Sequence, residues 1–153
     1  MAYCTKEDVI GELHPTLKLH MSGHYDQLHA ADPAQPDFSR FLTEHIAKAE
    51  ACANASLARA YRVPLKKATG IVTSAVCKIA AYFSAAAFAE KEAILKDKYE
   101  TAMLMLDNLV KANDPKLVDE EPDKLVTFAG YGSNPRIFTD LPKIGRASCR
   151  ERV

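Results

Sequence analysis

The chain has 153 residues, the size of one ordinary domain and enough to bury a hydrophobic core. Hydrophobic residues make up 48% and charged residues 26% of it, with few glycines and prolines, which excludes a fibrous chain and argues against a disordered one. The formal net charge is zero, so the chain lacks the basic footprint that is typical of nucleic-acid-binding proteins.

The N-terminal part of the chain predicts a short capped helix followed by a loop. Thr5 can accept a hydrogen bond from the backbone N–H of Asp8, and the acidic side chains of Glu7 and Asp8 suit the positive end of a helix. Pro15 is expected to end this helix. The stretch His14–Pro36 is polar and contains several prolines and a glycine, which predicts a long loop.

Three longer helices are predicted in the middle of the chain. Asp37 is a suitable N-cap for an amphipathic helix that ends before Pro64, because proline disfavours helical geometry in the preceding residue. After Gly70 the sequence is apolar nearly all round, which predicts a helix at the centre of the fold. A further amphipathic stripe runs over 95–110, and the cluster at 88–92 indicates that these last two helices are separate. The first stripe consists of Phe38, Leu42, Ile46, Ala49, Ala53, Leu57 and Ala60.

Beyond Pro115 the pattern changes to proline, aspartate, glycine and short apolar triplets, which predicts extended structure that packs on a neighbouring chain. The expected fold is mainly α: a small bundle of about four helices with a long N-terminal loop and an extended C-terminal arm. We expect a helical domain over residues 1–113 and the arm over residues 114–143.

The last ten residues, 144–153, match the translation of a common sequencing-library adapter. We expect this tail to be an artefact and leave it out of the fold prediction. Without its three arginines and one glutamate, the formal net charge changes from 0 to −2.

The cysteines and the N-terminus bear on the compartment. Cys4, Cys52, Cys77 and Cys149 show no short paired spacing, which favours a reducing cytoplasm over a disulfide framework. The N-terminus lacks a basic segment followed by an apolar one, and no apolar run of roughly 18 to 20 residues is evident. We therefore expect a soluble protein that is neither exported nor bound to a membrane.

Histidines are the most suggestive candidates for chemistry, because four of them lie within the predicted loop. His20 and His24 could share one helical face, but a zinc site needs three or four convergent ligands. No cysteine or acidic residue lies at a ligand spacing, so a solvated loop or an interface is favoured over a structural metal site. No cofactor is predicted.

The sequence does not predict an enzyme. It shows no nucleophile with a base, no pair of buried carboxylates and no glycine-rich phosphate loop. The run Gly130-Tyr131-Gly132 lacks both the third glycine and the strand-to-helix setting of a nucleotide site. Tyr61 and Pro64 are expected to fix a turn between two helices.

Several segments, in order, resemble one known family. They are Met1–Ile10, Ile46–Leu65 with its Tyr-Arg-Val-Pro-Leu ending, Val76–Tyr82, Tyr99–Leu106, and Ser133–Thr139. Together they resemble the phage head-tail connector (head-completion) family, in its Mu-like prophage neck-protein branch. The chain departs from the family in its histidine-rich stretch 14–29, where relatives often carry acidic residues.

The resemblance implies a structural virion protein of the phage neck. Its subunits would form a dodecameric ring beneath the portal protein and would dock the next neck or tail-completion protein. Genomic DNA would only pass through, and the protein would lie in the host cytoplasm before assembly. Pro135, Arg136, Ile137 and Phe138 would anchor the arm in a partner, since arginines and aromatics often dominate interface energies.

Two other functions stay open at the sequence level. One is a cytoplasmic helical adaptor that mediates protein interactions, and a more distant one is a metal-binding protein that uses the histidines.

Overall fold

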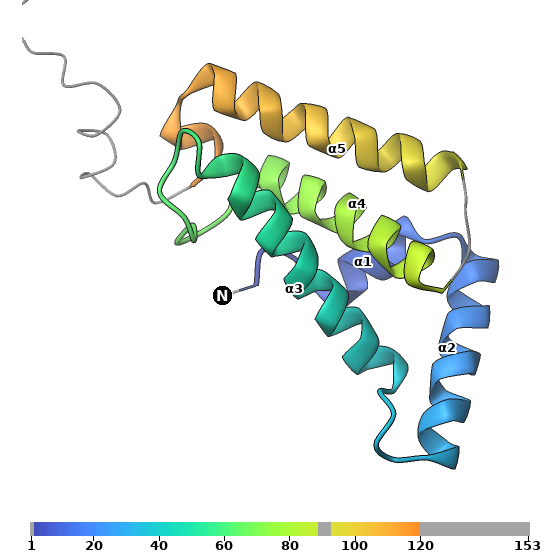
Figure 1. The fold of residues 1–153 in the computed structure, drawn as a ribbon. Helices are drawn as coiled ribbons and strands as arrows, with labels where there is room; N and C mark the ends of the chain where they lie inside the picture. The colour runs from blue at the N-terminus through green and yellow to red at the C-terminus, as the bar shows by residue number, and fades with distance from the viewer. Residues whose placement is uncertain (1, 89–92, 120–153) are drawn as a thin grey trace, which may run out of the picture. The chain divides into compact units, whose positions relative to one another are not determined.

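The structure is a computed structural model that describes residues 2–88 and 93–119. These residues form five α-helices and one short 3₁₀ helix (Figure 1). The helices are α1 (Lys6–Glu12), α2 (Pro15–Ala31), α3 (Phe38–Leu57), α4 (Gly70–Ala87), α5 (Ala93–Ala112) and the 3₁₀ helix η1 (Pro115–Leu117). The prediction of a mainly helical bundle is confirmed, with five α-helices in the described residues in place of about four.

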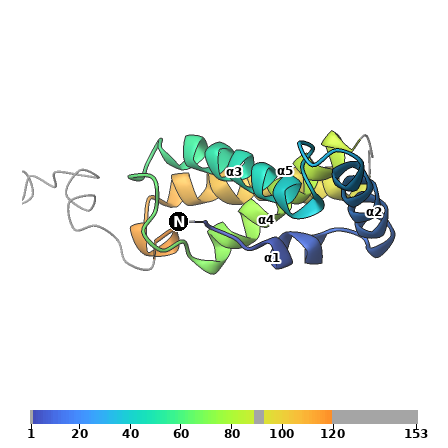
Figure 2. The same ribbon diagram turned by 90° about the horizontal axis from the view of Figure 1, so that it is seen from below.

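Helix α4 is the central element of the bundle. Helices α3 and α5 pack against it, and α1 lies along another side of it (Figure 2). Its alanines allow close approach of neighbouring helices, and its buried side chains come from nearly every part of its circumference, as its apolar sequence predicts. These buried residues are Val72, Ala75, Val76, Cys77, Ile79, Ala80, Ala81, Ser84 and Ala85.

By length and composition alone, α4 also resembles a membrane-spanning helix, with a mean hydropathy of 1.4 over 18 residues. Half of that stretch is buried inside the protein. The buried core helix of a globular protein has the same composition, and the packing of α3, α5 and α1 around α4 accounts for its apolar character.

The amphipathic stripes of the two neighbouring helices face this centre. On α3, the predicted positions from Leu42 to Leu57 are buried, and Asp37 caps the helix by accepting a hydrogen bond from the backbone N–H of Arg40 at 2.8 Å. On α5, the buried residues are Leu95, Ala102, Leu106 and Leu109. The predicted separation of α4 and α5 is also confirmed, because α4 ends at Ala87 and α5 begins at Ala93.

Helix α1 begins as predicted. Thr5 and Asp8 form a reciprocal capping box, in which the Thr5 side chain accepts from the Asp8 backbone and the Asp8 carboxylate accepts from the Thr5 backbone at 3.0 Å. At the other end of α1, Glu12 forms an ion pair of 2.8 Å with Lys98 of α5. The ends of α1 are thus fixed both by local capping and by a contact with a distant helix.

The predicted loop over His14–Pro36 is wrong, because most of this stretch forms α2. Pro15 occupies the first helical turn, where its missing N–H costs nothing, and His14 caps the helix by accepting from Thr16 at 3.3 Å. Leu17 and Met21 are buried and hold the helix on the bundle. The first helix ends before Pro15 as predicted, at Glu12, and Pro15 then starts a second helix in place of the predicted loop.

An aromatic contact holds α2 against α3. The ring of Tyr25 stacks on that of Phe41 with centroids 4.0 Å apart, and Phe41 in turn contacts the buried ring of His45 at 4.2 Å. Asp26 of α2 also accepts a hydrogen bond from the backbone of Phe38 at 3.3 Å. Only two side chains of α2 are buried, so these contacts with α3 carry much of its attachment.

Candidate functional site

The N-terminal segment and the segment after α5 meet at one end of the bundle, on the connection between α3 and α4. We call this region the terminal junction and define it as Ala2–Tyr3, Tyr61–Thr69 and Pro115–Asp119. Tyr3 is buried within it. The Tyr3 hydroxyl donates to Asn54 Oδ1 at 2.6 Å and accepts from the backbone N–H of Leu65 at 2.7 Å.

The backbone of Tyr3 is fixed as well, because its N–H donates to the Glu50 carboxylate of α3. Burial of the ring raises the pKa of the Tyr3 hydroxyl, although its hydrogen bonds to Leu65 and Asn54 act in the opposite direction. A neutral hydroxyl is the form that can both donate and accept. Tyr3 thus joins the N-terminal segment to α3 and to the connection that follows it.

Asp119 fastens the other terminal segment to the same connection. Its carboxylate accepts from the backbone N–H groups of Lys66 at 2.9 Å and Lys67 at 3.0 Å. Thr69 adds two contacts: its backbone N–H donates to the Val118 carbonyl at 3.1 Å, and its hydroxyl donates to the Leu117 carbonyl at 2.6 Å. Residues 115–119, which open the predicted arm, therefore pack on the helical domain.

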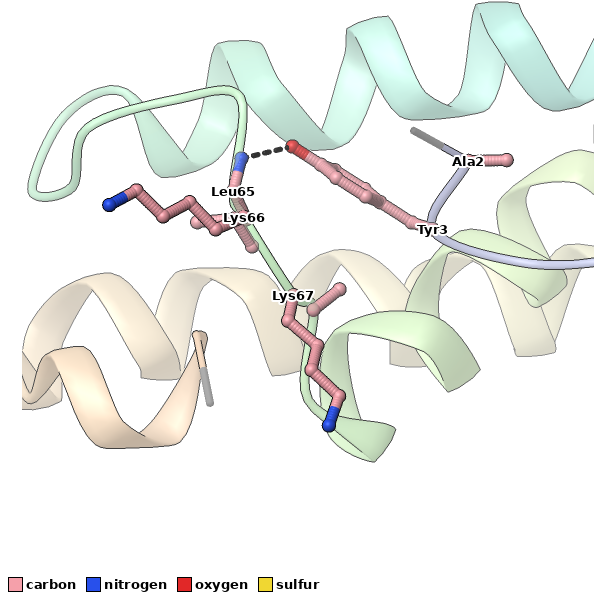
Figure 3. Close-up of a pocket in the computed structure, with 6 residues that line it drawn as sticks. Ala2, Tyr3, Leu65, Lys66 and Lys67 are labelled. Atoms are coloured by element: carbon pink, nitrogen blue, oxygen red, sulfur yellow. Dashed lines mark hydrogen bonds between the residues drawn. The ribbon is translucent and has the colours of Figure 1, made fainter. Parts of the chain in front are cut away.

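A pocket of 210 Å³ opens between the N-terminal segment and the connection (Figure 3). It is lined by Ala2, Tyr3, Leu65, Lys66, Lys67 and Ala68. The side chains of Lys66 and Lys67 extend in different directions in Figure 3, so their ammonium groups do not converge on one point. Because no polar groups converge on it, the pocket does not resemble a substrate site. It resembles a gap left between the N-terminal segment and the α3–α4 connection.

The two residues expected to fix a turn lie in the terminal junction. Tyr61 is buried, and its hydroxyl donates to the carbonyl of Leu109 in α5. Burial raises the pKa of this hydroxyl too. Pro64 is exposed and follows a cis peptide bond with Val63. Tyr61 therefore connects the end of α3 to the last turn of α5, and Pro64 lies at the surface of the same connection.

The histidines do not gather into a ligand cluster. His20 and His24 are both exposed on α2, and the His24 ring makes edge contacts with Tyr25 at 5.2 Å and Phe88 at 5.4 Å. No three histidine, cysteine or acidic side chains come together within residues 2–88 and 93–119. The geometry of this part of the chain assigns His24 to aromatic packing and assigns no metal centre.

The predicted partner-binding residues Pro135, Arg136, Ile137 and Phe138 lie outside the described residues, as does the tail 144–153. Two residues with clear structural roles escaped the sequence prediction. Tyr3 lies in the opening that the family resemblance highlighted, but no local pattern reveals partners 51 and 62 residues away. Asp119 is one of several acidic residues in this part of the sequence, and no local pattern reveals its hydrogen bonds to the backbone of residues 66–67.

The described residues form a small all-helical domain in which the N-terminal segment and the segment after α5 are both fixed on the α3–α4 connection. Comparison with protein families identifies the chain more closely. Residues 3–124 match the family described as bacteriophage Mu, Gp36, and the chain belongs to this family. The expected Mu-like phage origin is thereby confirmed at the level of the family. No curated protein and no solved structure matches the chain.

Proposed function

We propose that this protein is a structural component of the phage neck: a head-tail connector (head-completion) subunit that forms a ring under the portal and docks the next neck or tail protein. The observation that carries the proposal is the family membership over residues 3–124, which covers the whole described helical domain. Four ordered neck-protein-like motifs in the same region, and one beyond it, point in the same direction.

The described structure is compatible with repeated subunit contacts. Leu19 on α2 and Ile94 and Leu104 on α5 are between 63% and 71% exposed, although all three are large and apolar. Large exposed apolar side chains are available for contact with a partner, and single ones are also common on any protein surface. A ring repeats one heterologous contact around its axis, so each subunit presents two different surfaces to its neighbours.

The terminal junction supports the second part of the proposal. Asp119 fixes the first residues of the predicted arm on the α3–α4 connection. An extended segment that starts from a fixed point can add to a neighbour's backbone or enter its groove at a lower entropic cost than a free tail. In the proposed assembly the partners are the portal protein, other neck or tail-completion proteins and further copies of this chain.

The proposed role needs binding surfaces and no catalysis. The ring, which we propose to be dodecameric on the portal, lies in the neck of the virion, and its subunits lie in the host cytoplasm before assembly. Genomic DNA passes through the ring, and neither a membrane nor a cofactor takes part.

The experiment that tests the proposal combines the purified chain with the portal protein encoded by the same phage. We expect the two proteins to comigrate in velocity sedimentation, and electron microscopy to show an added ring on the portal. The chain alone and the portal alone serve as controls, because a subunit can stay monomeric until the portal templates it. A folded chain that does not associate with the portal at micromolar concentration contradicts the proposal.

A further inference from the structure

Acidic and basic residues are unevenly distributed along the chain. Between residues 7 and 50 there are eight aspartates and glutamates and three lysines and arginines. Between residues 51 and 88 there are five lysines and arginines and no acidic residue. The chain as a whole has no formal net charge, so this division places opposite charges on different parts of one molecule.

The cations at the terminal junction form what we call the basic surface. It consists of the exposed side chains Arg59, Arg62, Lys66, Lys67, Lys111 and Lys116. Asp107 lies among them, 2.9 Å from Arg59 and 2.8 Å from Lys111. Asp119 is only 7% exposed, and Asp114 caps η1. These three carboxylates are fewer than the cations around them, so the surface stays positive.

The acidic surface lies at the other end of α3, where α2 joins it (Figure 1). It consists of Asp26, Asp32, Asp37 and Glu44. The carboxylates of Asp26, Asp32 and Asp37 accept hydrogen bonds from backbone N–H groups at 3.3, 3.0 and 2.8 Å, which fix their positions and leave their negative charge. Arg40 is the only lysine or arginine between residues 26 and 44, and it lies 3.7 Å from Glu44 in an exposed pair. The surface therefore stays negative.

Helix α3 keeps the two surfaces apart. It has 20 residues, which corresponds to a length of about 30 Å. The Debye length is about 8 Å at physiological ionic strength, so exposed charges at this separation are screened from one another. Within one molecule the two surfaces therefore do not neutralise each other, whereas two molecules can bring them into contact.

Opposite charges at the two ends of α3 also favour one arrangement of neighbouring copies. An end-to-end contact between two like surfaces costs free energy, because it places charges of the same sign together. A head-to-tail contact places the basic surface of one copy on the acidic surface of the next. Such a contact is heterologous, and it closes into a ring when the rotation between copies permits.

We propose that the basic surface of one copy binds the acidic surface of the next copy, head to tail. The proposal deepens the neck function and rests on it, because it names the two surfaces through which a subunit contacts its neighbours in the ring. Nucleic acid is the other polyanion that a basic surface can bind. The spread of the cations favours a protein surface: Lys66 and Lys67 extend in different directions (Figure 3), and Asp107 and Asp114 lie among the cations.

Zero-length crosslinking tests the contact directly. Full chains with and without a heavy-nitrogen label are mixed at about 50 mM salt and treated with a carbodiimide, which joins a lysine amine to a touching carboxylate with loss of water. We expect mixed-isotope peptides that join Lys66, Lys67 or Lys116 to Asp32 or Glu44. At about 500 mM salt their yield should fall about tenfold. Mixed peptides at other positions, or none at all, overturn the proposal.

Paired variants test the head-to-tail arrangement. Lys66→Glu/Lys116→Glu changes the basic surface, and Asp32→Lys/Glu44→Lys changes the acidic one. In sedimentation velocity at low salt and high protein concentration, we expect the wild-type chain to form oligomers beyond the dimer. Each variant alone should associate at least about tenfold more weakly, and an equimolar mixture should recover association because it contains one intact surface of each sign.

The controls separate this contact from general effects of charge and folding. Lys18→Glu/Lys96→Glu makes the same charge change outside both surfaces and should associate like the wild type. Circular dichroism checks that each variant folds, and Asp32→Asn/Glu44→Gln replaces the lysine variant if it does not. A mixture that fails to recover overturns the proposal. So does a wild-type chain that stops at dimers, which is the behaviour of an antiparallel pair.

Two further measurements distinguish the remaining outcomes. Binding of short duplex DNA that is lost in Lys66→Glu/Lys116→Glu, together with absent mixed crosslinks, assigns the basic surface to nucleic acid and overturns the proposal. The same crosslinks are also sought in chains bound to portal protein. Portal-bound chains without them contradict the head-to-tail contact alone, whereas crosslinked chains that do not bind the portal contradict the neck function alone.

Discussion

The Tyr3 hydroxyl lies between a donor from the α3–α4 connection and an acceptor on α3. It accepts from the Leu65 backbone and donates to Asn54, and both contacts are shorter than 2.8 Å. Leu65 is itself buried. A single oxygen therefore satisfies a buried backbone N–H and positions the first residues of the chain.

Replacing this tyrosine tests that role. Tyr3→Phe should lower the free energy of unfolding by about 1–3 kcal/mol, because the Leu65 N–H loses its partner in a site that water reaches poorly. Urea unfolding followed by circular dichroism measures the change. Tyr99→Phe is the matched control, since the Tyr99 ring stacks on Tyr82 and its hydroxyl has no hydrogen bond to the described residues. Equal effects of the two variants would count against the role of the Tyr3 hydroxyl.

The same hydroxyl should make stability depend on pH in the alkaline range. Burial raises the pKa of Tyr3 in the folded state above its ordinary value of 10.0. The stabilisation is therefore complete below about pH 10 and is lost as the pH rises through the folded-state value. We expect the unfolding midpoint in urea to fall above pH 10 and to fall less steeply in Tyr3→Phe. Parallel curves for the two proteins would contradict this assignment.

At the scale of single elements, the structure differs most from the sequence prediction at α2, which is a helix where a loop was expected. Gly23 lies inside this helix, and a methyl group added to it would meet nothing within 4 Å. Gly23→Ala should therefore stabilise the protein by about 0.5–1 kcal/mol, because alanine loses less backbone entropy in a helix. Urea denaturation measures the difference. No gain in stability, or a loss, would be the result expected of the loop that the sequence predicts.

The attachment of α2 to the bundle can be tested separately. Met21 is fully buried, whereas Leu19 on the same helix is 71% exposed. Met21→Ala should lower the free energy of unfolding by about 2–5 kcal/mol, because it removes buried apolar contacts and leaves a cavity. Leu19→Ala should change it by no more than about 0.5 kcal/mol. Thermal and urea unfolding of both variants provide the comparison, and similar losses would mean that α2 does not pack as described.

At the scale of the whole molecule, the terminal junction holds the first residues of the predicted arm, 115–119, on the helical domain. We expect deletion of residues 133–142 to leave the helical domain folded and to weaken assembly on the portal. Within residues 2–88 and 93–119, the buried side chains from Tyr3 to Val118 form one hydrophobic core. Far-ultraviolet circular dichroism measures folding, and cosedimentation with the portal protein measures assembly. Loss of helicity on deletion would show that the segment belongs to the core of its own subunit.

Periodicity predicted the helices that bury a full stripe. On α3 and α5, apolar residues recur at helical spacing because one side of each helix packs on α4, so the pattern is visible without the partner. Helix α2 escaped the prediction because it buries only Leu17 and Met21 and begins with a proline that normally signals a break. Its stability comes from contacts such as the stack of Tyr25 on Phe41, which are not visible in local sequence.

The sequence by itself determined the helical class, the central position of α4 and, through ordered motifs, a phage family that the match over residues 3–124 confirms. Local sequence encodes these properties, through the spacing of apolar residues and through short family-like motifs. Only the tertiary structure decided that Tyr3 and Asp119 meet on one connection and that Glu12 pairs with Lys98 of α5. Such pairs depend on how helices distant in sequence pack together, and no local pattern encodes a long-range contact.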